Sequence, residues 1–149
     1  MLRLFLLWTV IGEFKPAPDV TYSLSKDKDG QMLYRAEVKG VVLTYDLKTL
    51  RVEPADGVTR IEAIDFAGAV TGGWAILFHS EASALRSTSS FEVKADGKLK
   101  IMVCGLAPGG WEVWHNGWLE DTSNGVDAKT GVLLFEGTEG SYFLRRSGG

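Results

Sequence analysis

The sequence lacks disulfide partners, zinc-binding patterns and clustered basic charge. Cys104 is the only cysteine, so no internal disulfide can form. Neither a CxxC nor an HExxH pattern occurs, and zinc therefore has no sequence support. The 16 lysines and arginines are outnumbered by 19 acidic residues, whereas duplex binding requires a basic surface that displaces counterions. We therefore expect no metal, no cofactor and no nucleic-acid partner.

Long apolar runs are also missing, except at the N-terminus. Residues 1–11 carry one arginine and then apolar side chains, a run too short to span a membrane as a helix, so no membrane partner is expected. A short signal peptide is an alternative, but no small-residue cleavage site follows the run. We interpret residues 2–10 as a strand buried on both faces, with Leu4, Leu6 and Trp8 on one of them. A chain that begins on such a strand is consistent with a piece of a longer protein.

No window shows a convincing helical period, and turn signals recur along the whole chain. Many of these turns contain one of the 18 glycines, because glycine adopts a positive φ without steric penalty. The segments between turns are short and rich in β-branched and aromatic residues. This pattern predicts an all-β fold with little or no helix, an antiparallel β-sandwich of Fn3/Ig-like or jelly-roll-like type, in a single domain over residues 1–149. The expected core includes Leu4, Leu6, Trp8, Phe78, Ile101, Val103 and Phe135.

A turn at Asp96-Gly97 allows its loop length to be predicted. A two-residue loop would divide the apolar residues of the two arms between opposite faces, since side chains alternate along a strand. A three-residue loop over residues 95–97 instead places Val93 opposite Leu99 on one face. Gly97 then supplies the left-handed residue of a bulged hairpin turn.

Tryptophan is concentrated in one place, since three of the five fall within eight residues. Asn116-Gly117 lies between two apolar-rich arms there, which is the strongest short-range signal for a hairpin. With a two-residue loop, His115 lies opposite Trp118, and Trp114 lies opposite Leu119. Tryptophans then occupy both faces of the hairpin, so one cluster is exposed if only one face packs on the core.

The residues around this turn are of the kind found on sugar-binding surfaces. An exposed indole covers the apolar C–H side of a pyranose, while polar neighbours form hydrogen bonds to its hydroxyls. The candidate carbohydrate-binding residues are Trp114, His115, Asn116 and Trp118. The alternative is that these tryptophans belong to the core, as tryptophans of small β domains usually do.

The same register predicts a pair of acidic side chains. It places Val113 opposite Glu120, and Glu112 opposite Asp121. Opposed side chains lie about 4.5–5.5 Å apart at Cβ, and two carboxyl groups about 5–5.5 Å apart suit a retaining glycosidase. Glu112 and Asp121 are therefore the catalytic candidates of an alternative interpretation. The simpler alternative is a solvated edge hairpin in which both acids point into water.

Several motifs toward the C-terminus share a pattern of closing strands: Gly105–Val113, Asn116-Gly117, Gly131–Phe135 and Gly140–Leu144. The pattern resembles the C-terminal β-sandwich domains of heparinase II/III-like polysaccharide lyases over roughly the last third of the chain. Those lyases carry their catalytic machinery largely on a helical toroid domain, so no lyase catalytic residue can be assigned here. The resemblance implies a carbohydrate-active context, a polysaccharide or oligosaccharide partner, and an extracellular or periplasmic location.

The favoured interpretation is an accessory or carbohydrate-binding β-sandwich module of a polysaccharide-degrading system. One alternative is a small free-standing glycosidase-like hydrolase that uses the paired carboxylates. Another is a structural or interaction domain. The sequence leaves the ligand, the compartment and the oligomeric state open. Exposure of Trp114 or Trp118 favours binding, a cleft with paired acids favours catalysis, and full burial favours a structural role.

Overall fold

The computed structural model describes residues 8–46, 49–79, 88–126 and 130–147, with side chains at all of them except 8–10 and 121–124. The described residues form fourteen β-strands and no helix, which confirms the all-β prediction. Accordingly, these ranges contain no helix that is long and apolar enough to cross a membrane. The chain divides into two compact units, residues 1–56 and residues 57–149. The single domain over residues 1–149 stays a prediction.

The first unit is a five-stranded antiparallel meander in which every strand pairs with the next along the chain. Its strands are β1 (Trp8–Ala17), β2 (Val20–Asp27), β3 (Met32–Val38), β4 (Val41–Tyr45) and β5 (Leu50–Glu53). Alternate residues of β2 are buried, as the period of an extended strand requires: Val20, Tyr22 and Leu24. The predicted N-terminal strand pairs with β2 from Trp8 onward. Leu4, Leu6 and the side chain of Trp8 lie outside the described residues.

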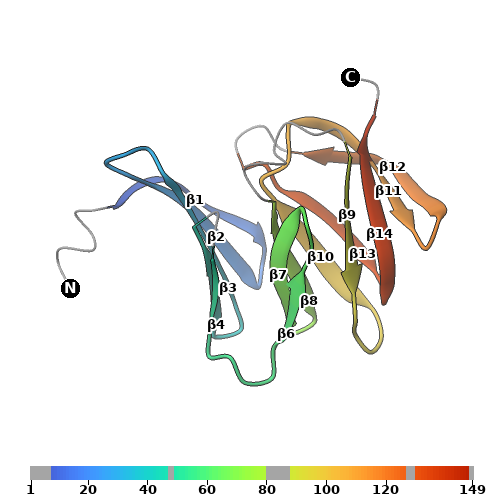
Figure 1. Ribbon diagram of the computed structural model, residues 1–149, viewed down its shortest axis with the longest axis horizontal. Helices are drawn as coiled ribbons and strands as arrows, with labels where there is room; N and C mark the ends of the chain where they lie inside the picture. The colour runs from blue at the N-terminus through green and yellow to red at the C-terminus, as the bar shows by residue number, and fades with distance from the viewer. Residues whose placement is uncertain (1–7, 47–48, 80–87, 127–129, 148–149) are drawn as a thin grey trace. The chain divides into compact units, whose positions relative to one another are not determined.

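The second unit is a sandwich of two sheets that share one hydrophobic core (Figure 1). One sheet has the order β13-β10-β8-β7-β6 and the other the order β12-β11-β14-β9. The first five strands in chain order are β6 (Thr59–Glu62), β7 (Phe66–Thr71), β8 (Trp74–His79), β9 (Thr88–Val93) and β10 (Leu99–Cys104). The remaining four are β11 (Gly109–His115), β12 (Trp118–Val126), β13 (Leu133–Gly137) and β14 (Gly140–Arg146).

Two details of strand pairing differ from the sequence-based prediction. Strands β8 and β10 pair in parallel, with Ile101 opposite Ala75, so the sheet is mixed rather than purely antiparallel. The predicted hairpin around Gly97 does not form, because β9 and β10 belong to different sheets. Gly97 does have the predicted left-handed conformation, with φ of 82°. Val93 and Leu99 are both buried in the shared core, and alternation alone cannot distinguish a hairpin from a loop that crosses between two sheets.

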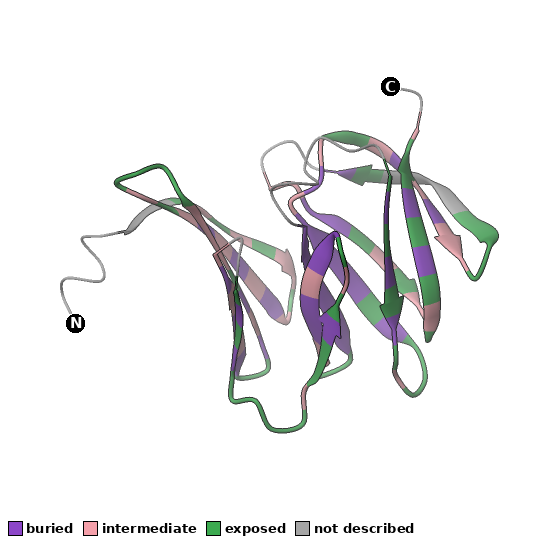
Figure 2. Ribbon diagram, in the orientation of Figure 1, coloured by how far each residue is buried: buried purple, intermediate pink, exposed green. Residues whose placement is uncertain are grey.

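The described residues that the alternation predicts to be core residues are buried or partly buried. Phe78, Ile101 and Val103 are almost completely buried, while Phe135 is partly buried and packs against the core. Along β9 and β14, buried and exposed positions alternate, as Figure 2 shows. All six residues of β8 are buried, which is typical of a strand covered on both faces.

An aromatic row runs through this core toward one edge of the sandwich. Phe66 packs edge-on against Phe91, with 5.2 Å between ring centroids. Phe91 stacks on Tyr142 at 5.3 Å, and Phe135 approaches the same tyrosine at 5.7 Å. Such pairs stabilise a core by about 0.5–1.5 kcal/mol each beyond their burial. The row therefore connects the buried core to the strand β14 on which Tyr142 lies.

We expect Gly68→Ala to destabilise the sandwich by about 1–3 kcal/mol, the usual cost of overpacking. A Cβ atom at Gly68 would lie 2.1 Å from the carbonyl oxygen of Ile76, a backbone atom that cannot rotate away. Gly125→Ala is the matched control, because a Cβ atom there meets nothing within 4 Å. Its effect should stay within about 0.5 kcal/mol. Urea denaturation measures both, and equal stability of the two variants would contradict the packing described for β7 and β8.

Candidate functional site

Strands β11 and β12 form the predicted tryptophan-rich hairpin. Asn116 and Gly117 both have positive φ, 51° and 85°, as a two-residue type I′ turn requires. His115 lies opposite Trp118, and Trp114 lies opposite Leu119. The turn and the two pairs nearest to it are therefore confirmed.

Beyond these two pairs the predicted register is wrong. Val113 lies opposite Asp121 rather than Glu120, because β12 contains one extra residue between Leu119 and Asp121. This β-bulge at Glu120 shifts the pairing of Val113 by one position, and a second irregularity between Val113 and Trp111 shifts the pairs from Trp111 onward by two. The predicted opposition of Glu112 and Asp121 does not form. The register from which a retaining glycosidase was suggested therefore differs from the observed one.

Glu112 has other partners in the folded hairpin. Its Oε1 accepts hydrogen bonds from Nε of Arg145 at 2.8 Å and from Nε1 of Trp114 at 3.1 Å. Arg145 Nη2 also lies 2.8 Å from the same oxygen, so two nitrogen atoms of the guanidinium contact one carboxylate oxygen in a charge-assisted pair. Glu112 therefore fixes the indole of Trp114 and pairs with Arg145.

The three tryptophans of the hairpin occupy different environments. Trp111 is fully buried in the core, where its Nε1 donates a hydrogen bond to the carbonyl oxygen of Ala107. Trp114 is half-buried on the outer face of the sheet, between Leu119 and Phe143 of the neighbouring strands. Trp118 is 77% exposed. Of the three tryptophans of the hairpin, Trp111 is therefore the one that belongs to the core.

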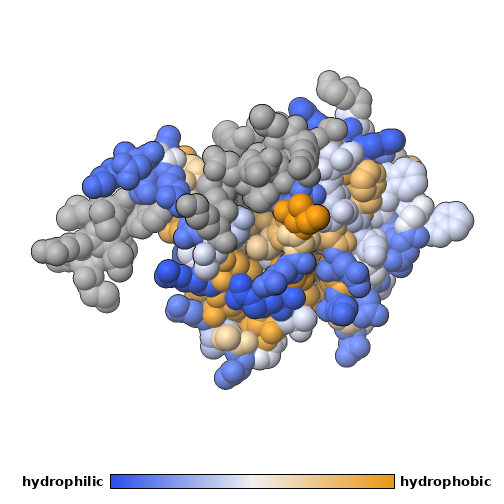
Figure 3. Space-filling model, viewed as in Figure 1, coloured by the Kyte–Doolittle hydropathy of each residue, from blue (hydrophilic) through white to orange (hydrophobic). Residues whose placement is uncertain are grey.

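Apolar side chains also reach the surface near this hairpin. Leu119 is 44% exposed and Phe143 is 40% exposed, both on the outer face with Trp114. In the space-filling view, hydrophobic patches lie among hydrophilic residues on the face that it presents (Figure 3). Exposed indole and phenyl rings favour contact with a ligand or partner, because water solvates them poorly.

A cavity of about 380 Å³ lies at the edge of the sandwich, beside the inner face of the hairpin. This volume is at the lower end of the range for small-molecule sites, about 300–1,000 Å³. Three rings and three charged side chains contribute most of its lining: His115, Phe135, Tyr142, Lys98, Glu120 and Glu136. The two sheets thus supply the cavity jointly, through β13 on one side and β11, β12 and β14 on the other.

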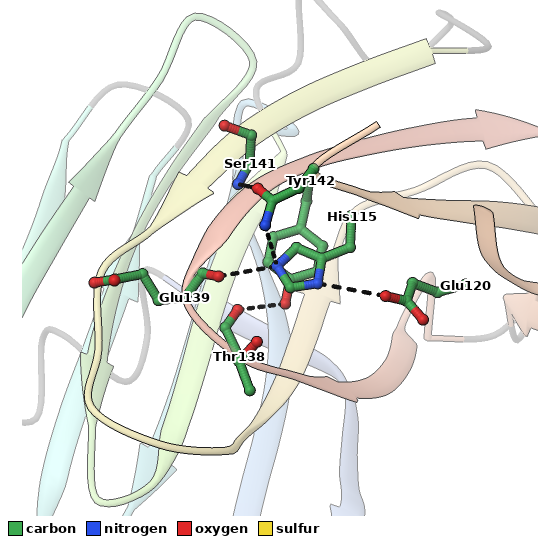
Figure 4. A network of polar contacts seen from close by, with 7 residues as sticks. His115, Glu120, Thr138, Glu139, Ser141 and Tyr142 are labelled. Atoms are coloured by element: carbon green, nitrogen blue, oxygen red, sulfur yellow. Dashed lines mark hydrogen bonds and ion pairs between the residues drawn. The ribbon is translucent and has the colours of Figure 1, made fainter. Parts of the chain in front are cut away.

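The imidazole of His115 is held from several directions (Figure 4). It stacks on the ring of Tyr142, with 4.4 Å between centroids and 2° between planes. Its Nε2 lies 2.9 Å from the carbonyl oxygen of Glu139, and its Nδ1 lies 3.5 Å from Oε1 of Glu120. Glu120 therefore lines the cavity together with His115. The side chain of His115 is only 12% exposed, so its position is fixed before any ligand arrives.

Asn116 supports the hairpin rather than facing the cavity. Its side-chain Oδ1 accepts a hydrogen bond from the backbone N–H of Ser141 at 2.9 Å. The backbone N–H of Asn116 donates a hydrogen bond to the carbonyl oxygen of Ser141 at 2.8 Å. Gly140 makes this contact possible, since a Cβ atom there would lie 2.5 Å from Asn116 Oδ1 and 2.6 Å from His115 Nε2. These bonds attach the turn to β14.

Tyr142 forms the floor of the cavity. Its phenol donates a 2.5 Å hydrogen bond to the carbonyl oxygen of Thr138. Burial raises the pKa of Tyr142, and the negative charge of Glu120 raises it further. A Cβ atom at Gly137 would lie 2.1 Å from the phenol oxygen, so the phenol occupies space that only glycine leaves free.

The comparison with known families matches the same part of the chain. The model of the heparinase II C-terminal domain matches residues 60–146, which is more than half of the chain. The chain belongs to the heparinase II C-terminal domain family. This membership gives it a polysaccharide lyase context. No curated protein sequence matches the chain.

The heparinase II C-terminal domain extends further along the chain than the motifs indicated. The resemblance rested on roughly the last third, whereas the match begins at residue 60 and includes every strand of the sandwich except the first residue of β6. Both sheets and the whole cavity therefore lie within the family domain. Lys98, Phe135, Glu136 and Tyr142 were not predicted as site residues. Of these four residues, only Lys98 had a local signal, because it directly follows the predicted turn at Asp96-Gly97. The others could not be predicted as site residues, since the cavity forms only where strands of two separate sheets meet.

We expect Tyr142 to make stability depend on alkaline pH. Its folded pKa lies above the ordinary value of 10.0, so the stability it contributes is present below about pH 10 and is lost as pH rises through the folded pKa. Tyr142→Phe should lose about 0.5–1.5 kcal/mol at neutral pH, because the Thr138 carbonyl loses its donor, and should show a shallower alkaline decline.

Unfolding free energy measured by urea titration over neutral to alkaline pH tests this expectation. Tyr45 serves as the control, since burial raises its pKa as well. Tyr142→Phe should remove only the Tyr142 part of the pH dependence. Parallel pH profiles for the variant and the wild type would contradict the assignment.

Proposed function

We propose that this domain is an accessory module that binds a polysaccharide or oligosaccharide at the tip of the β11–β12 hairpin. Two features support the proposal: the polysaccharide lyase context of the family, and a cavity of suitable size beside the hairpin. The observation that carries it is the position of Trp118. This residue is 77% exposed and lies directly opposite His115, which lines the cavity.

The pairing of Trp118 with His115 puts a stacking surface next to polar groups. Directly opposed residues of an antiparallel pair have Cβ atoms about 4.5–5.5 Å apart on the same face. An exposed indole on the same face as His115 can cover the apolar side of one sugar ring. The hydroxyls of that sugar then reach the carboxylate of Glu120 and the ammonium of Lys98, which accept and donate hydrogen bonds respectively.

The remaining candidate residues have distinct roles in this proposal. His115 presents a fixed edge to the sugar because Tyr142 and Glu139 hold its ring. Asn116 positions the turn through its bonds to Ser141. Trp114 lies on the opposite face of the hairpin and contacts the ligand only if the polysaccharide extends around the tip. Comparing Trp114 with Trp118 therefore tests how far the ligand extends.

We expect Trp118→Ala to weaken binding about tenfold, equivalent to about 1.4 kcal/mol, a typical value for an aromatic contact. Its melting temperature should stay unchanged, because the side chain is mostly exposed. Trp114→Ala should behave in the opposite way and lose about 1–3 kcal/mol of stability, less than the 3–5 kcal/mol of a fully buried aromatic ring. Calorimetric titration with a panel of oligosaccharides and a thermal melt measure the two quantities separately.

Two outcomes would contradict the proposal. The first is a wild-type domain that binds none of the oligosaccharides or polysaccharides offered. The second is a Trp118→Ala variant that binds as tightly as the wild type. A Trp114→Ala variant that retains stability but loses affinity would instead extend the site to the outer face.

A further inference from the structure

The cavity beside the hairpin is buried on its inner side and charged on its outer side. Val113 and Tyr142 line it, and each belongs to the shared core and is only 2% exposed. Lys98, Glu120 and Glu136 also line it, and their side chains are between 55% and 69% exposed. The cavity therefore ends on the core at one side and opens toward solvent at the other.

The turn between β13 and β14 closes the cavity at one end. Thr138 lines the cavity from this turn, and its carbonyl oxygen accepts the hydrogen bond of the Tyr142 phenol (Figure 4). The carbonyl oxygen of Glu139 contacts Nε2 of His115, and its carboxylate accepts a hydrogen bond from the backbone N–H of Ala95 at 3.4 Å. The turn is therefore attached to β11, to β14 and to the loop before β10, and forms a wall of the cavity.

The two strands that flank the cavity come together further along the edge of the sandwich. The cavity lies beside Glu120, near the start of β12, and Gly137, the last residue of β13. At the opposite ends of these strands, Val126 of β12 and Leu133 of β13 are both buried in the shared core, and the two strands are in contact. The cavity is therefore enclosed at both of its ends, unlike a groove that runs along the edge.

We propose that this cavity binds the terminal unit of a saccharide chain and not a unit from its interior, an inference that rests on the proposed function above. An interior unit has a linked neighbour on each side, and a linear chain enters and leaves its site in different directions. A terminal unit has a single linked neighbour and needs one exit, which the solvent side of the cavity supplies. The volume of about 380 Å³, at the lower end for small-molecule sites, also suits a short piece of a chain. Each cleavage of a polysaccharide creates two new ends, so the number of binding places rises as the polymer is degraded.

The first test compares fractions of one polysaccharide that differ only in chain length. Sulfated and non-sulfated glycosaminoglycans, alginate and β-glucan are each offered as short, intermediate and long fractions, and calorimetric titration gives the number of domains bound per chain. Binding at ends should give the same number of domains per chain, and the same dissociation constant per mole of chains, at every length. Binding to interior units should give a number of domains that rises with chain length.

The second test blocks the chain ends without changing the length. An oligosaccharide that carries a bulky substituent on both terminal units should bind at least about tenfold more weakly than the unblocked form, equivalent to about 1.4 kcal/mol. Forms blocked at the reducing end alone or at the non-reducing end alone then identify the end that enters the cavity.

A variant of the protein tests whether the cavity is the place where the end binds. Thr138 is exposed and lines the cavity, so Thr138→Trp should fill it without entering the core, and should weaken binding at least about tenfold, equivalent to about 1.4 kcal/mol. Thr59→Trp is the matched control, because Thr59 is exposed on β6 away from the cavity lining, and it should bind as the wild type does. Thermal melts of both variants show whether each is folded.

The possible results have distinct meanings. A number of bound domains that rises with chain length, or full binding of the form blocked at both ends, overturns the recognition of chain ends and leaves carbohydrate binding intact. Unchanged binding by a folded Thr138→Trp variant places the saccharide elsewhere and overturns the role of the cavity. Failure of every oligosaccharide and polysaccharide to bind overturns both this inference and the proposed function.

Discussion

The stacked contacts of Tyr142 are the interaction on which the sandwich and its cavity both depend. One face of the ring stacks on Phe91 in the core, and the ring also stacks on His115 at the cavity. The phenol donates to the carbonyl of Thr138 in the turn between β13 and β14. A single side chain therefore couples the interior packing to the geometry of the candidate site. This coupling requires a glycine at position 137, because any larger residue would meet the phenol oxygen.

The hairpin carries the candidate binding residues at the edge of its sheet. Its type I′ turn leaves Trp118 exposed, and hydrogen bonds between Asn116 and Ser141 attach the turn to β14. Glu120, the extra residue of the bulge in β12, places its Oε1 3.5 Å from Nδ1 of His115. Bulges are common beside functional sites, where the extra residue locally disrupts the ladder and re-aims a side chain.

The charges of the hairpin are distributed unevenly between its two faces. On the outer face, Arg145 compensates Glu112, and this pair fixes Trp114. On the cavity face, Lys98 forms an ion pair with Glu136, and Glu120 lies beside the imidazole of His115. The two faces of the hairpin therefore have different charged neighbours, which come from β14 on the outer face and from β13 and the loop before β10 on the cavity face. Family membership gives the polysaccharide lyase context, whereas this distribution of charge is a property of the individual residues.

Local features of the sequence determined the strands, the turns and the buried positions. Asn116-Gly117 specifies its turn because both residues tolerate positive φ, and Gly97 adopts its left-handed conformation for the same reason. Alternation identified Ile101 and Val103 as core residues, since one face of each strand must be buried. These signals act within a few residues of each other. They do not depend on which strands become neighbours in the folded sheets.

Tertiary structure alone decided the strand partners and the completed site. Strand β10 pairs in parallel with β8, and β9 joins the opposite sheet, although the local pattern suits a β9–β10 hairpin equally well. The bulge at Glu120 was not predicted, since the Asn-Gly turn indicated a hairpin of regular register. Lys98 reaches the cavity from the loop before β10, and His115 reaches it from the other sheet. The physical reason is that such contacts arise from long-range packing, whereas alternation and turn chemistry report only local backbone geometry.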